Sequence, residues 1–481
     1  MVKDARRRAH NYLDETYWDG LDNAAKLFPA ISNTRSSNVF RMTAVLFEEV
    51  RPDILKQAVE RALEVMPAFA VKLHTGLFWY YFEPNYEKPT VREDYRYPCT
   101  HFLRYYENGY LFRVTYYHRR INLEVFHALT DGMGATSFLH CLLYYYFNLM
   151  DGDAVPEDVI RRIADTSSVE FDEDSFVRNT VRDDEQSRQS ISAQVSEPPE
   201  AYHINGYKYD GDRLGALMAI LPTDKLLALA HEKGVTLSEY MCGLLIWSIY
   251  NTTYRRSKRS KPIVISVPVN LRGLFGSNTM RNFFGHLSIA VSGEGLTFDD
   301  VLKTTAEQLK NCLTKGYFER QIAAHVRIEQ IPIVRFVPIW LKNLILRQQY
   351  MRTQRTYTCT FSNVGRMQLP EAIADRVERF ELLLSGSQTH PKKVSLISYR
   401  NNLVLGFAST IDDNSIERFM ISFLVSEGLD VTISSNETPA PSRSSKEEPS
   451  RLSKEKAKAE KAERKAIKKA AKREKKERER Q

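Results

Sequence analysis

The sequence predicts an α/β fold in two domains, or in two lobes around one cleft. Its 481 residues are more than one small core can organise, and hydrophobic residues make up 43% of them, which is enough for sizeable cores. Helix-type and strand-type patterns of apolar residues occur in both halves of the chain. The 25 Tyr and 24 Phe are typical of strand-rich segments that bury large side chains.

Residues 1–150 have the patterns of one folded unit. Apolar residues recur at helical spacing after Pro52, and proline is favoured in the first turn of a helix. Aromatic and β-branched residues indicate strands, two of which are joined by the short turn 118–120 and suit a hairpin. The expected elements are a helix over 52–64, strands over 77–82, 110–116 and 121–126, and a helix over 133–150.

Residues 151–200 predict an acidic linker or partly disordered crossover, because Asp, Glu, Ser and Arg dominate and large apolar residues are sparse. Order resumes near Tyr202, and a second lobe is expected over 201–435. Thr236, followed three residues later by Glu239, is typical of a capping box at the start of a helix. The expected elements are helices over 226–230 and 237–250 and strands over 263–269, 286–291, 357–361 and 394–399.

The net charge of +8 comes from the C-terminal tail, residues 436–481. Between Arg443 and Gln481 the chain has 17 Lys and Arg and 8 Asp and Glu, so this segment carries +9 and the rest of the chain −1. The tail lacks an apolar stripe and is expected to be disordered or partly helical. The eight acidic residues dilute its charge, which favours a solvated extension, and contact with nucleic acid or an anionic membrane is the alternative.

The five cysteines are scattered without a CxxC pair, which favours inert thiols in a reducing compartment over a disulfide framework or a zinc site. The first residues carry no apolar segment of a secretory signal, and no run reaches the roughly 18 apolar residues of a membrane span. We therefore expect a cytoplasmic protein. The most apolar stretch, 331–346, predicts a buried or partly buried segment, with a lid, a tunnel wall or a peripheral membrane contact as alternatives.

One short motif, His-Ala-Leu-Thr-Asp-Gly at 127–132, carries candidate chemistry. It follows a predicted strand and precedes a predicted helix, and loops at strand ends often hold catalytic groups on a rigid base. His127 suits general-base work because the usual pKa of histidine, about 6.5, lies near working pH. Asp131 can orient the loop through a distant arginine, and Gly132 lets the backbone approach a substrate. A structural histidine is the alternative, and the strand-to-helix context favours a functional one.

Residues 124–135, Glu-Val-Phe-His-Ala-Leu-Thr-Asp-Gly-Met-Gly-Ala, resemble the HxxxDG active-site motif of the condensation-domain superfamily, which includes chloramphenicol acetyltransferase and the alcohol O-acetyltransferases. Three further stretches agree in order and spacing. They are Gly-Val-Thr-Leu-Ser-Glu-Tyr at 234–240, Val-Pro-Val-Asn-Leu-Arg at 267–272 with Asn-Phe-Phe-Gly at 282–285, and Phe-Ser-Asn-Val-Gly at 361–365. The resemblance covers about residues 1–435 and is nearest to bacterial alcohol O-acetyltransferase-like proteins.

The resemblance implies two chloramphenicol acetyltransferase-like lobes, each a mixed sheet with flanking helices, around a central tunnel. Donor thioester and acceptor would enter from opposite faces and meet at His127, which would take the proton from the acceptor. Asp131 would pair with Arg272 as a structural partner rather than polarise His127. Candidates for the oxyanion or substrate contacts are Ser362, Asn363, Asn270, Asn282 and a backbone N–H near Gly132. For Asn282, a role in shaping the crossover is favoured over contact with the substrate.

Peptide-forming condensation domains usually carry two adjacent histidines, and the first of these positions is Phe126 here. This difference resembles the free-standing alcohol-acyltransferase branch and favours ester formation. We also expect a monomer that uses acyl-coenzyme A as co-substrate and a small alcohol or amine as acceptor. Neither a metal nor a bound cofactor is expected. The alternative is a catalytically inactive scaffold of the same fold that binds a polyanion or a protein partner through its basic tail.

Overall fold

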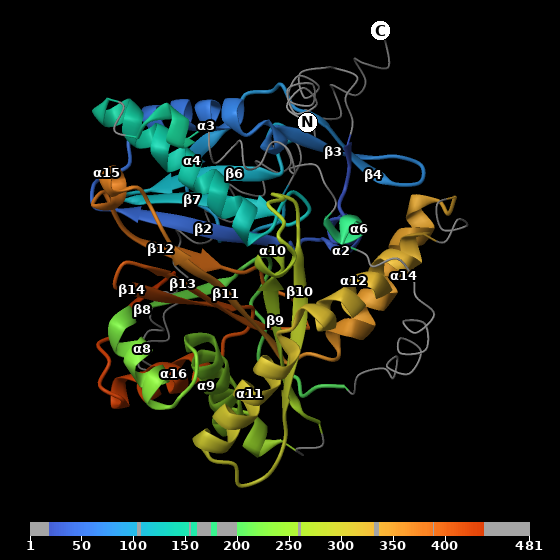
Figure 1. Ribbon diagram of the computed structural model, residues 1–481, viewed down its shortest axis with the longest axis vertical. Helices are drawn as coiled ribbons and strands as arrows, with labels where there is room; N and C mark the ends of the chain where they lie inside the picture. Colours follow the sequence, from blue (N-terminus) through green and yellow to red (C-terminus); the bar gives the residue numbers. More distant parts are fainter. Residues whose placement is uncertain are drawn as a thin grey trace, which may run out of the picture. The chain divides into compact units, whose positions relative to one another are not determined.

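The computed structural model describes residues 19–102, 107–152, 155–160, 175–179, 200–257, 261–330, 336–387 and 389–436. These residues belong to one compact unit and form three β-sheets with helices packed against them (Figure 1). Most of the crossover predicted over 151–200, and the basic tail beyond Asn436, lie outside the described residues.

A five-stranded sheet with the order β12-β2-β7-β6-β5 forms the first lobe. Its strands are β2 (Val39–Leu46), β5 (Val91–Glu93), β6 (Phe112–Tyr117), β7 (Arg120–Phe126) and β12 (Val377–Leu383). Helices α3 (Pro52–Val65) and α4 (Gly132–Asp151) pack against each other, and α4 packs on β2 and β7. β6 and β7 are the antiparallel hairpin that the sequence predicts. Both long helices predicted for this part of the chain are confirmed.

Strand β12 joins the first lobe from far along the chain. It pairs antiparallel with β2, with Leu382 opposite Met42. The chain therefore returns from the second lobe to complete the edge of the first sheet. The sequence patterns did not predict this strand. The predicted lobes, 1–150 and 201–435, place residues 377–383 in the second lobe, whereas the strand completes the sheet of the first.

A seven-stranded mixed sheet with the order β10-β9-β11-β13-β14-β8-β15 forms the second lobe. Its strands are β8 (Gly215–Pro222), β9 (Ile263–Asn270), β10 (Phe284–Val291), β11 (Cys359–Met367), β13 (Lys392–Tyr399), β14 (Asn402–Ser409) and β15 (Thr432–Ser435). Its helices are α8 (Thr223–Glu232), α9 (Leu237–Thr252), α11 (Phe298–Cys312) and α16 (Ser415–Ser426). The capping box predicted for Thr236 and Glu239 is present at the start of α9.

The two lobes meet where β12 lies against β13 and β14, as Figure 1 shows. Along β13, Val394 and Leu396 point into the second lobe's core, while Ile397 belongs to the core shared with the first lobe. Gly406 of β14 is a required glycine, because a Cβ there would lie 2.1 Å from the carbonyl oxygen of Leu382. Close backbone contact thus fixes one lobe against the other.

A small sheet with the order β1-β4-β3 lies beside the first lobe and contains β1 (Asp19–Gly20), β3 (Val71–Thr75) and β4 (Tyr80–Pro84). The strand predicted over 77–82 starts only at Tyr80. The residues before it form the β3–β4 turn, in which the N–H of Gly76 donates to the carbonyl of Trp79 at 2.9 Å. The turn carries large apolar side chains, which are typical of strands, and this is why the prediction starts three residues too early.

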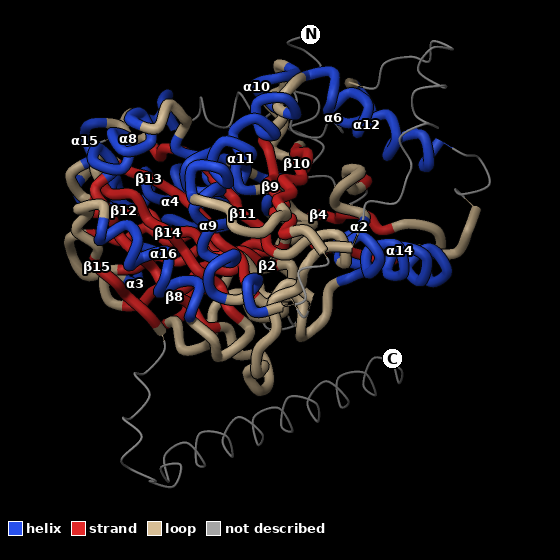
Figure 2. Tube along the Cα trace, turned by 90° about the horizontal axis from the view of Figure 1, so that it is seen from below, coloured by secondary structure: helices blue, strands red, loops and turns tan. Residues whose placement is uncertain are grey.

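Helix α14 (Ile339–Gln354) packs against the short helix α2 (Leu27–Ile31), and Figure 2 shows the two side by side. No residue of α14 is fully buried. For the described part of the apolar stretch 331–346, a core segment is therefore wrong, whereas a partly buried one fits. No helix among the described residues is long and apolar enough to cross a bilayer. The remaining helical elements are α12 (Lys315–Gln330), η1 (Pro67–Phe69), α6 (Ser175–Arg178), η2 (Tyr254–Arg256), α10 (Arg272–Phe275) and α15 (Glu371–Ala374).

Candidate active site

His127 is the first residue after β7, in a short loop that leads into α4. Its backbone N–H donates to the carbonyl of Asn38 at 2.9 Å, and the N–H of Leu129 donates to the carbonyl of Phe126 at 2.9 Å. Both hydrogen bonds tie the loop to the first sheet, because Phe126 ends β7 and Asn38 directly precedes β2. The imidazole itself keeps partial exposure.

A chain of side-chain hydrogen bonds sets the tautomer of His127. Its Nδ1 lies 3.0 Å from Oδ1 of Asn282, whose Nδ2 donates to Oδ2 of Asp22 at 3.0 Å. An ionised carboxylate only accepts hydrogen bonds, so the amide NH2 must face Asp22 and the amide oxygen must face the imidazole. Nδ1 therefore carries the proton, and Nε2 keeps its lone pair free to accept another.

Asp22 is a residue that sequence reasoning missed. Besides the Asn282 side chain, its carboxylate accepts the backbone N–H of Asn282 at 3.2 Å and that of Ala25 at 2.7 Å. Both Asp22 and Asn282 are buried. No local pattern joins them, because 260 positions separate them in the chain.

Three phenylalanines hold the imidazole of His127 in place. The ring of Phe28 from α2 stacks on it at 4.6 Å, Phe40 from β2 meets its edge at 5.1 Å, and Phe284 from β10 lies at 5.4 Å. These contacts remove water from the ring. Desolvation accordingly lowers the pKa of His127, and the opposing effects of Asp131 and Asn282 only partly compensate. His127 is therefore neutral near pH 7, as a general base must be.

Asp131 does not touch the imidazole but ties the loop to the second lobe. It is the N-cap of α4, and its Oδ1 accepts two N–H groups of the first helical turn at 3.1 and 3.2 Å. Its Oδ1 and Oδ2 also accept Nη2 and Nη1 of Arg272 at 3.0 and 2.8 Å, and Oδ2 accepts the N–H of Phe283 at 3.0 Å. The ion pair expected between Asp131 and Arg272 is thus present.

The remaining donors of Arg272 bind the segment that carries Asn282. Nε donates to the carbonyl of Thr279 and Nη2 to that of Arg281, both at 2.7 Å. Nη1 also reaches Oδ1 of Asn270 at 3.1 Å. Asn270 is thereby engaged with Arg272 at the exposed end of β9, and no contact joins it to His127.

The first turn of α4 begins close to the second lobe, and one glycine there is required by the close contact. A Cβ on Gly134 would lie 1.9 Å from Oγ1 of Thr130 and 2.6 Å from the carbonyl oxygen of Met280, so only glycine fits there. A Cβ on Gly132 would meet Cγ2 of Val364 at 3.5 Å, an ordinary contact. The start of α4 therefore abuts the Ser-Asn-Val-Gly segment of β11.

Ser362 and Asn363 lie on opposite faces of β11. Asn363 donates Nδ2 to Oγ of Ser238 in α9 at 2.9 Å, and its Oδ1 accepts the N–H of Gly365 at 2.8 Å. Phe361 is part of the second lobe's core, so Ser362, its neighbour in the strand, faces the first lobe. Among the described residues, the hydroxyl of Ser362 has no hydrogen-bond partner.

Lys393 is a second residue that sequence reasoning missed. On β13 the neighbouring Lys392 points to the opposite face, where Nζ donates to Oε1 of Glu417 at 2.6 Å. Lys393 therefore faces the first lobe, and within the described part of the chain no carboxylate pairs with it. Desolvation lowers its pKa to about 8, and its positive charge contributes to lowering the pKa of His127.

Solved structures share this architecture at low sequence identity. The first condensation domain of the calcium-dependent antibiotic synthetase, solved with a substrate analogue, has a TM-score of 0.58 at 16% identity, over 86% of this chain and 96% of that one. A mutant starter condensation domain of the rhizomide synthetase RzmA in complex with C8-CoA gives 0.56 at 12% identity, over 86% and 94%. The chain has the condensation-domain fold. Neither a protein-family model nor a curated protein matches the sequence.

The same fold is found in TRI3 trichothecene 15-O-acetyltransferase from Fusarium sporotrichioides, with a TM-score of 0.53 at 12% identity over 84% of this chain and 94% of that one. The expected two-lobed architecture of mixed sheets with flanking helices is therefore confirmed. In this condensation-domain fold, His127 lies where the two lobes meet, with partners from both.

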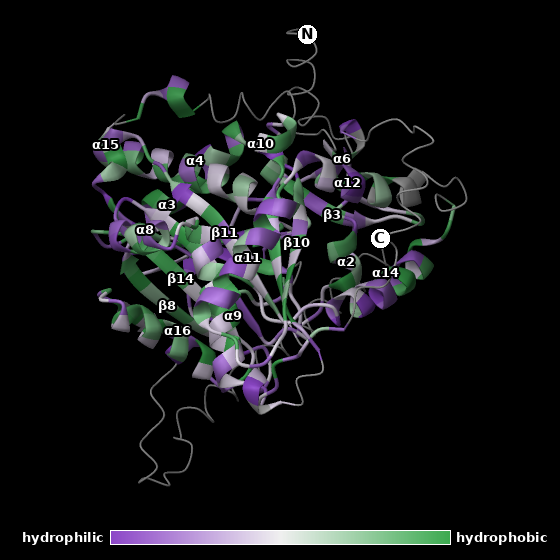
Figure 3. Ribbon diagram, turned by 60° about the horizontal axis from the view of Figure 1, so that its bottom comes forward, coloured by the Kyte–Doolittle hydropathy of each residue, from purple (hydrophilic) through white to green (hydrophobic). Residues whose placement is uncertain are grey.

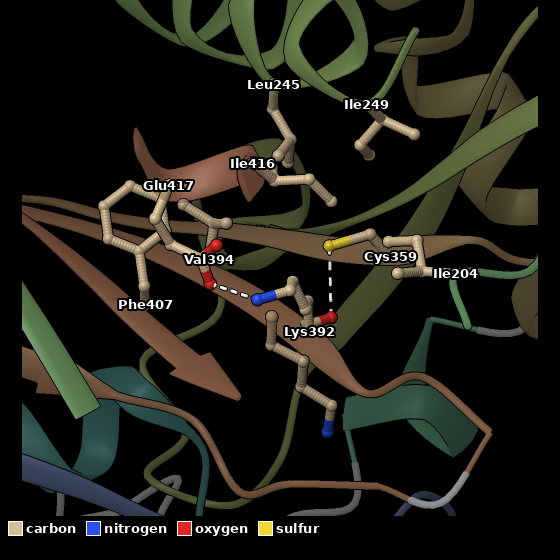
Figure 4. Close-up of a pocket in the computed structure, with 10 residues that line it drawn as sticks. Ile204, Leu245, Ile249, Cys359, Lys392, Val394, Phe407, Ile416 and Glu417 are labelled. Carbon is tan, nitrogen blue, oxygen red and sulfur yellow. Dashed lines mark hydrogen bonds and ion pairs between the residues drawn. The ribbon is translucent and has the colours of Figure 1, made fainter. Parts of the chain in front are cut away.

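A pocket within the second lobe of this fold is separate from His127. Figure 4 shows Lys392 directed at Glu417 among apolar side chains of α9, β13 and α16. Lys392 and Glu417 are both buried, and the pocket has no room for a water molecule. We interpret it as a structural ion pair within the core. Among the described residues, no group of three or more His, Cys, Asp or Glu is placed to hold a metal.

The positive charge of Lys393 predicts that replacing this residue shifts the pH dependence of activity. If neutral His127 is the base, activity should rise with pH through its lowered pKa and be level near pH 7. Lys393→Met removes a positive charge that lowers this pKa, so the acidic limb of the kcat/KM profile should move to higher pH. Lys393→Arg keeps the charge and should leave the limb in place, and an equal shift in both variants would contradict the electrostatic cause.

Proposed function

We propose that this chain transfers an acyl group, acetyl being our first choice, from a coenzyme A thioester to an alcohol hydroxyl, with His127 as the general base. The observation that carries the proposal is the Asp22–Asn282–His127 hydrogen-bond chain. It presents a neutral imidazole whose Nε2 is free to take a proton, in a partly exposed position between two lobes. A histidine that served only to support the core would not need its tautomer and ring plane set by residues from both lobes.

The proposed reaction has two steps. Nε2 of His127 takes the proton from the acceptor hydroxyl as its oxygen attacks the thioester carbonyl, which forms a tetrahedral oxyanion. The oxyanion then collapses, the C–S bond breaks, and the imidazolium returns its proton to the departing coenzyme A sulfur. The products are an ester and free coenzyme A thiol, and His127 is regenerated.

The oxyanion requires hydrogen-bond donors that are not already engaged. Nδ2 of Asn363 donates one of its two N–H groups to Ser238, and Nδ2 of Asn282 donates one of its two to Asp22, so both amides are already held by other partners. The hydroxyl of Ser362 and the backbone N–H of Gly132 have no acceptor among the described residues. We propose that these two groups bind the oxyanion, because the start of α4 and β11 abut at Gly132 and Val364.

Phe126 supports an alcohol rather than an amine as acceptor. Phe126 stands at the first of the two positions that are histidines in peptide-forming domains. Its side chain is buried in the core, on the side of β7 opposite to His127. Coenzyme A as donor agrees with the C8-CoA bound to the rhizomide synthetase domain, and ester formation agrees with the O-acetyltransferase among the similar folds.

The proposal is tested by a screen of acyl-coenzyme A donors of increasing chain length against alcohols and amines, read by release of free thiol. We expect thiol release that depends on the presence of an alcohol. Release with amines only would move the reaction to amide formation. No acceptor-dependent release with any pair would leave the inactive scaffold as the better account.

Asn282 is proposed as a positioning residue, and its replacement tests the assigned tautomer. Asn282→Leu keeps a similar volume but removes the acceptor for the Nδ1 proton, so the proton can move to Nε2 and block the base. We expect kcat to fall by about 10²-fold or more with little change in KM for acyl-coenzyme A. A thermal stability so low that the variant is unfolded at the assay temperature would instead explain the loss of kcat by a purely structural role.

A further inference from the structure

Helix α14 presents a stripe of large apolar side chains to solvent. Trp340 and Leu344 are four residues apart in α14, and Met351 continues the same side of the helix two turns later. Phe336 lies in the turn just before the helix. These four side chains are between 60% and 73% exposed. Soluble proteins rarely leave such a continuous apolar surface without a partner.

The β3–β4 turn extends this surface. Leu77 and Trp79 at its tip are 68% and 50% exposed. The turn is held against the start of α14, because the N–H of Ile339 donates to the carbonyl of Leu77 at 2.8 Å and Nζ of Lys342 donates to that of Phe78 at 2.7 Å. The exposed apolar face, as we call it, consists of Leu77, Trp79, Phe336, Trp340, Leu344 and Met351.

Charge indicates what covers this face. Residues 336–370 contain no Asp or Glu, whereas α14 and its C-cap carry Lys342, Arg347, Arg352 and Arg355. Figure 3 shows polar and apolar segments side by side along α14. Tryptophan, phenylalanine and leucine flanked by basic residues are typical of helices that lie in the interface of an anionic membrane. A second copy of this chain fits less well, because a symmetric contact would bring the basic side chains of two α14 helices together.

The short helix α2 connects the exposed apolar face to His127, because it contacts both α14 and the imidazole. Nε of Arg347 in α14 donates to the carbonyl of Ala30 in α2 at 2.5 Å, and Phe28 of the same short helix stacks on the imidazole at 4.6 Å. An acceptor dissolved in a membrane would thus meet the protein beside its phenylalanine-lined base.

We propose that α14 and the β3–β4 turn dock on an anionic lipid surface, and that the acceptor is a lipid-soluble alcohol taken from it. The docking rests on the exposed apolar face and on the basic residues of α14, while the nature of the acceptor rests on the proposed acyl transfer. The basic tail, wherever it lies, adds charge of the same sign.

Vesicle sedimentation of the full-length protein tests the docking. With phosphatidylcholine vesicles containing phosphatidylglycerol, we expect binding that weakens in pure phosphatidylcholine and at high salt. The double variant Trp79→Ala/Trp340→Ala should lower the partition coefficient by about tenfold or more, because two interfacial side chains are lost. The tail is present in every sample, so its contribution is constant.

The matched control is Phe47→Ala/Tyr207→Ala, which removes two exposed aromatic side chains elsewhere and should change binding by less than about twofold. Thermal unfolding checks that both double variants remain folded. Unchanged vesicle binding in the tryptophan variant would overturn the proposal, and so would a wild-type dimer that the variant converts to monomers, since a second copy would then cover the face. Sedimentation involves no chemistry, so its outcome is independent of whether acyl transfer is found.

Discussion

His127→Ala should lower kcat for thiol release from acyl-coenzyme A with an alcohol by about 10²- to 10⁴-fold, the usual contribution of a positioned general base. The variant removes the only group whose free Nε2 is set up by the Asp22–Asn282 chain. Because the ring is partly exposed and packs on phenylalanines rather than anchoring a strand, the fold should persist. Steady-state kinetics with matched thermal unfolding curves measure both effects.

The control for this variant is His231→Ala, which replaces an exposed histidine in the last turn of α8. Its kcat should equal that of the wild type. Turnover by His127→Ala within about threefold of wild type would contradict the role of His127, given the size of general-base effects. If His127→Ala fails to fold, His127→Gln provides the second test, because it keeps a polar side chain of similar length but supplies no base.

Arg272→Met should destabilise the protein by about 3–5 kcal/mol, the usual effect of leaving one partner of a buried ion pair alone. The side chains of Asp131 and Arg272 are only 7% and 11% exposed, and Arg272 also binds the carbonyls of Thr279 and Arg281. Urea unfolding measures the change. Activity should fall as well, because the segment that carries Asn282 loses its attachment to the loop of His127.

A solvent-exposed ion pair provides the comparison. Lys225→Met breaks the contact with Asp430, where the two side chains are 52% and 92% exposed, and should change stability by less than about 1 kcal/mol. Equal effects of the two substitutions would show that burial does not govern the Asp131–Arg272 pair. The stabilising role assigned to that pair would then be wrong.

Local sequence patterns predicted the elements whose signals are confined to a single segment. Helices α3, α4 and α9, and the hairpin of β6 and β7, follow from apolar spacing, a proline start and a capping box. The HxxxDG segment stood out in the same way, because strand, loop and helix follow one another directly. Patterns failed where side chains did not match their setting, as in the β3–β4 turn, whose Leu77 and Trp79 are exposed.

Long-range pairing could not be predicted from residues alone. Arg272 was expected as the partner of Asp131 only through a resemblance to a known family, and 141 positions separate the two. Asp22, which sets the Asn282 amide and through it the tautomer of His127, gave no sequence signal. Lys393 could have been found, because successive side chains of a strand point to opposite faces of the sheet. When both faces of the strand are covered, each of two adjacent lysines must therefore face the interior. Strand β12 shows the same limit for the fold itself.

The central claim is that the chain forms an ester from acyl-coenzyme A and an alcohol through His127. A parallel measurement of ester by mass spectrometry and of free thiol, for wild type and His127→Ala, tests it most directly. We predict equal amounts of ester and thiol with the wild type and neither above background with the variant. Thiol release without ester, or equal ester formation by both proteins, would contradict the claim.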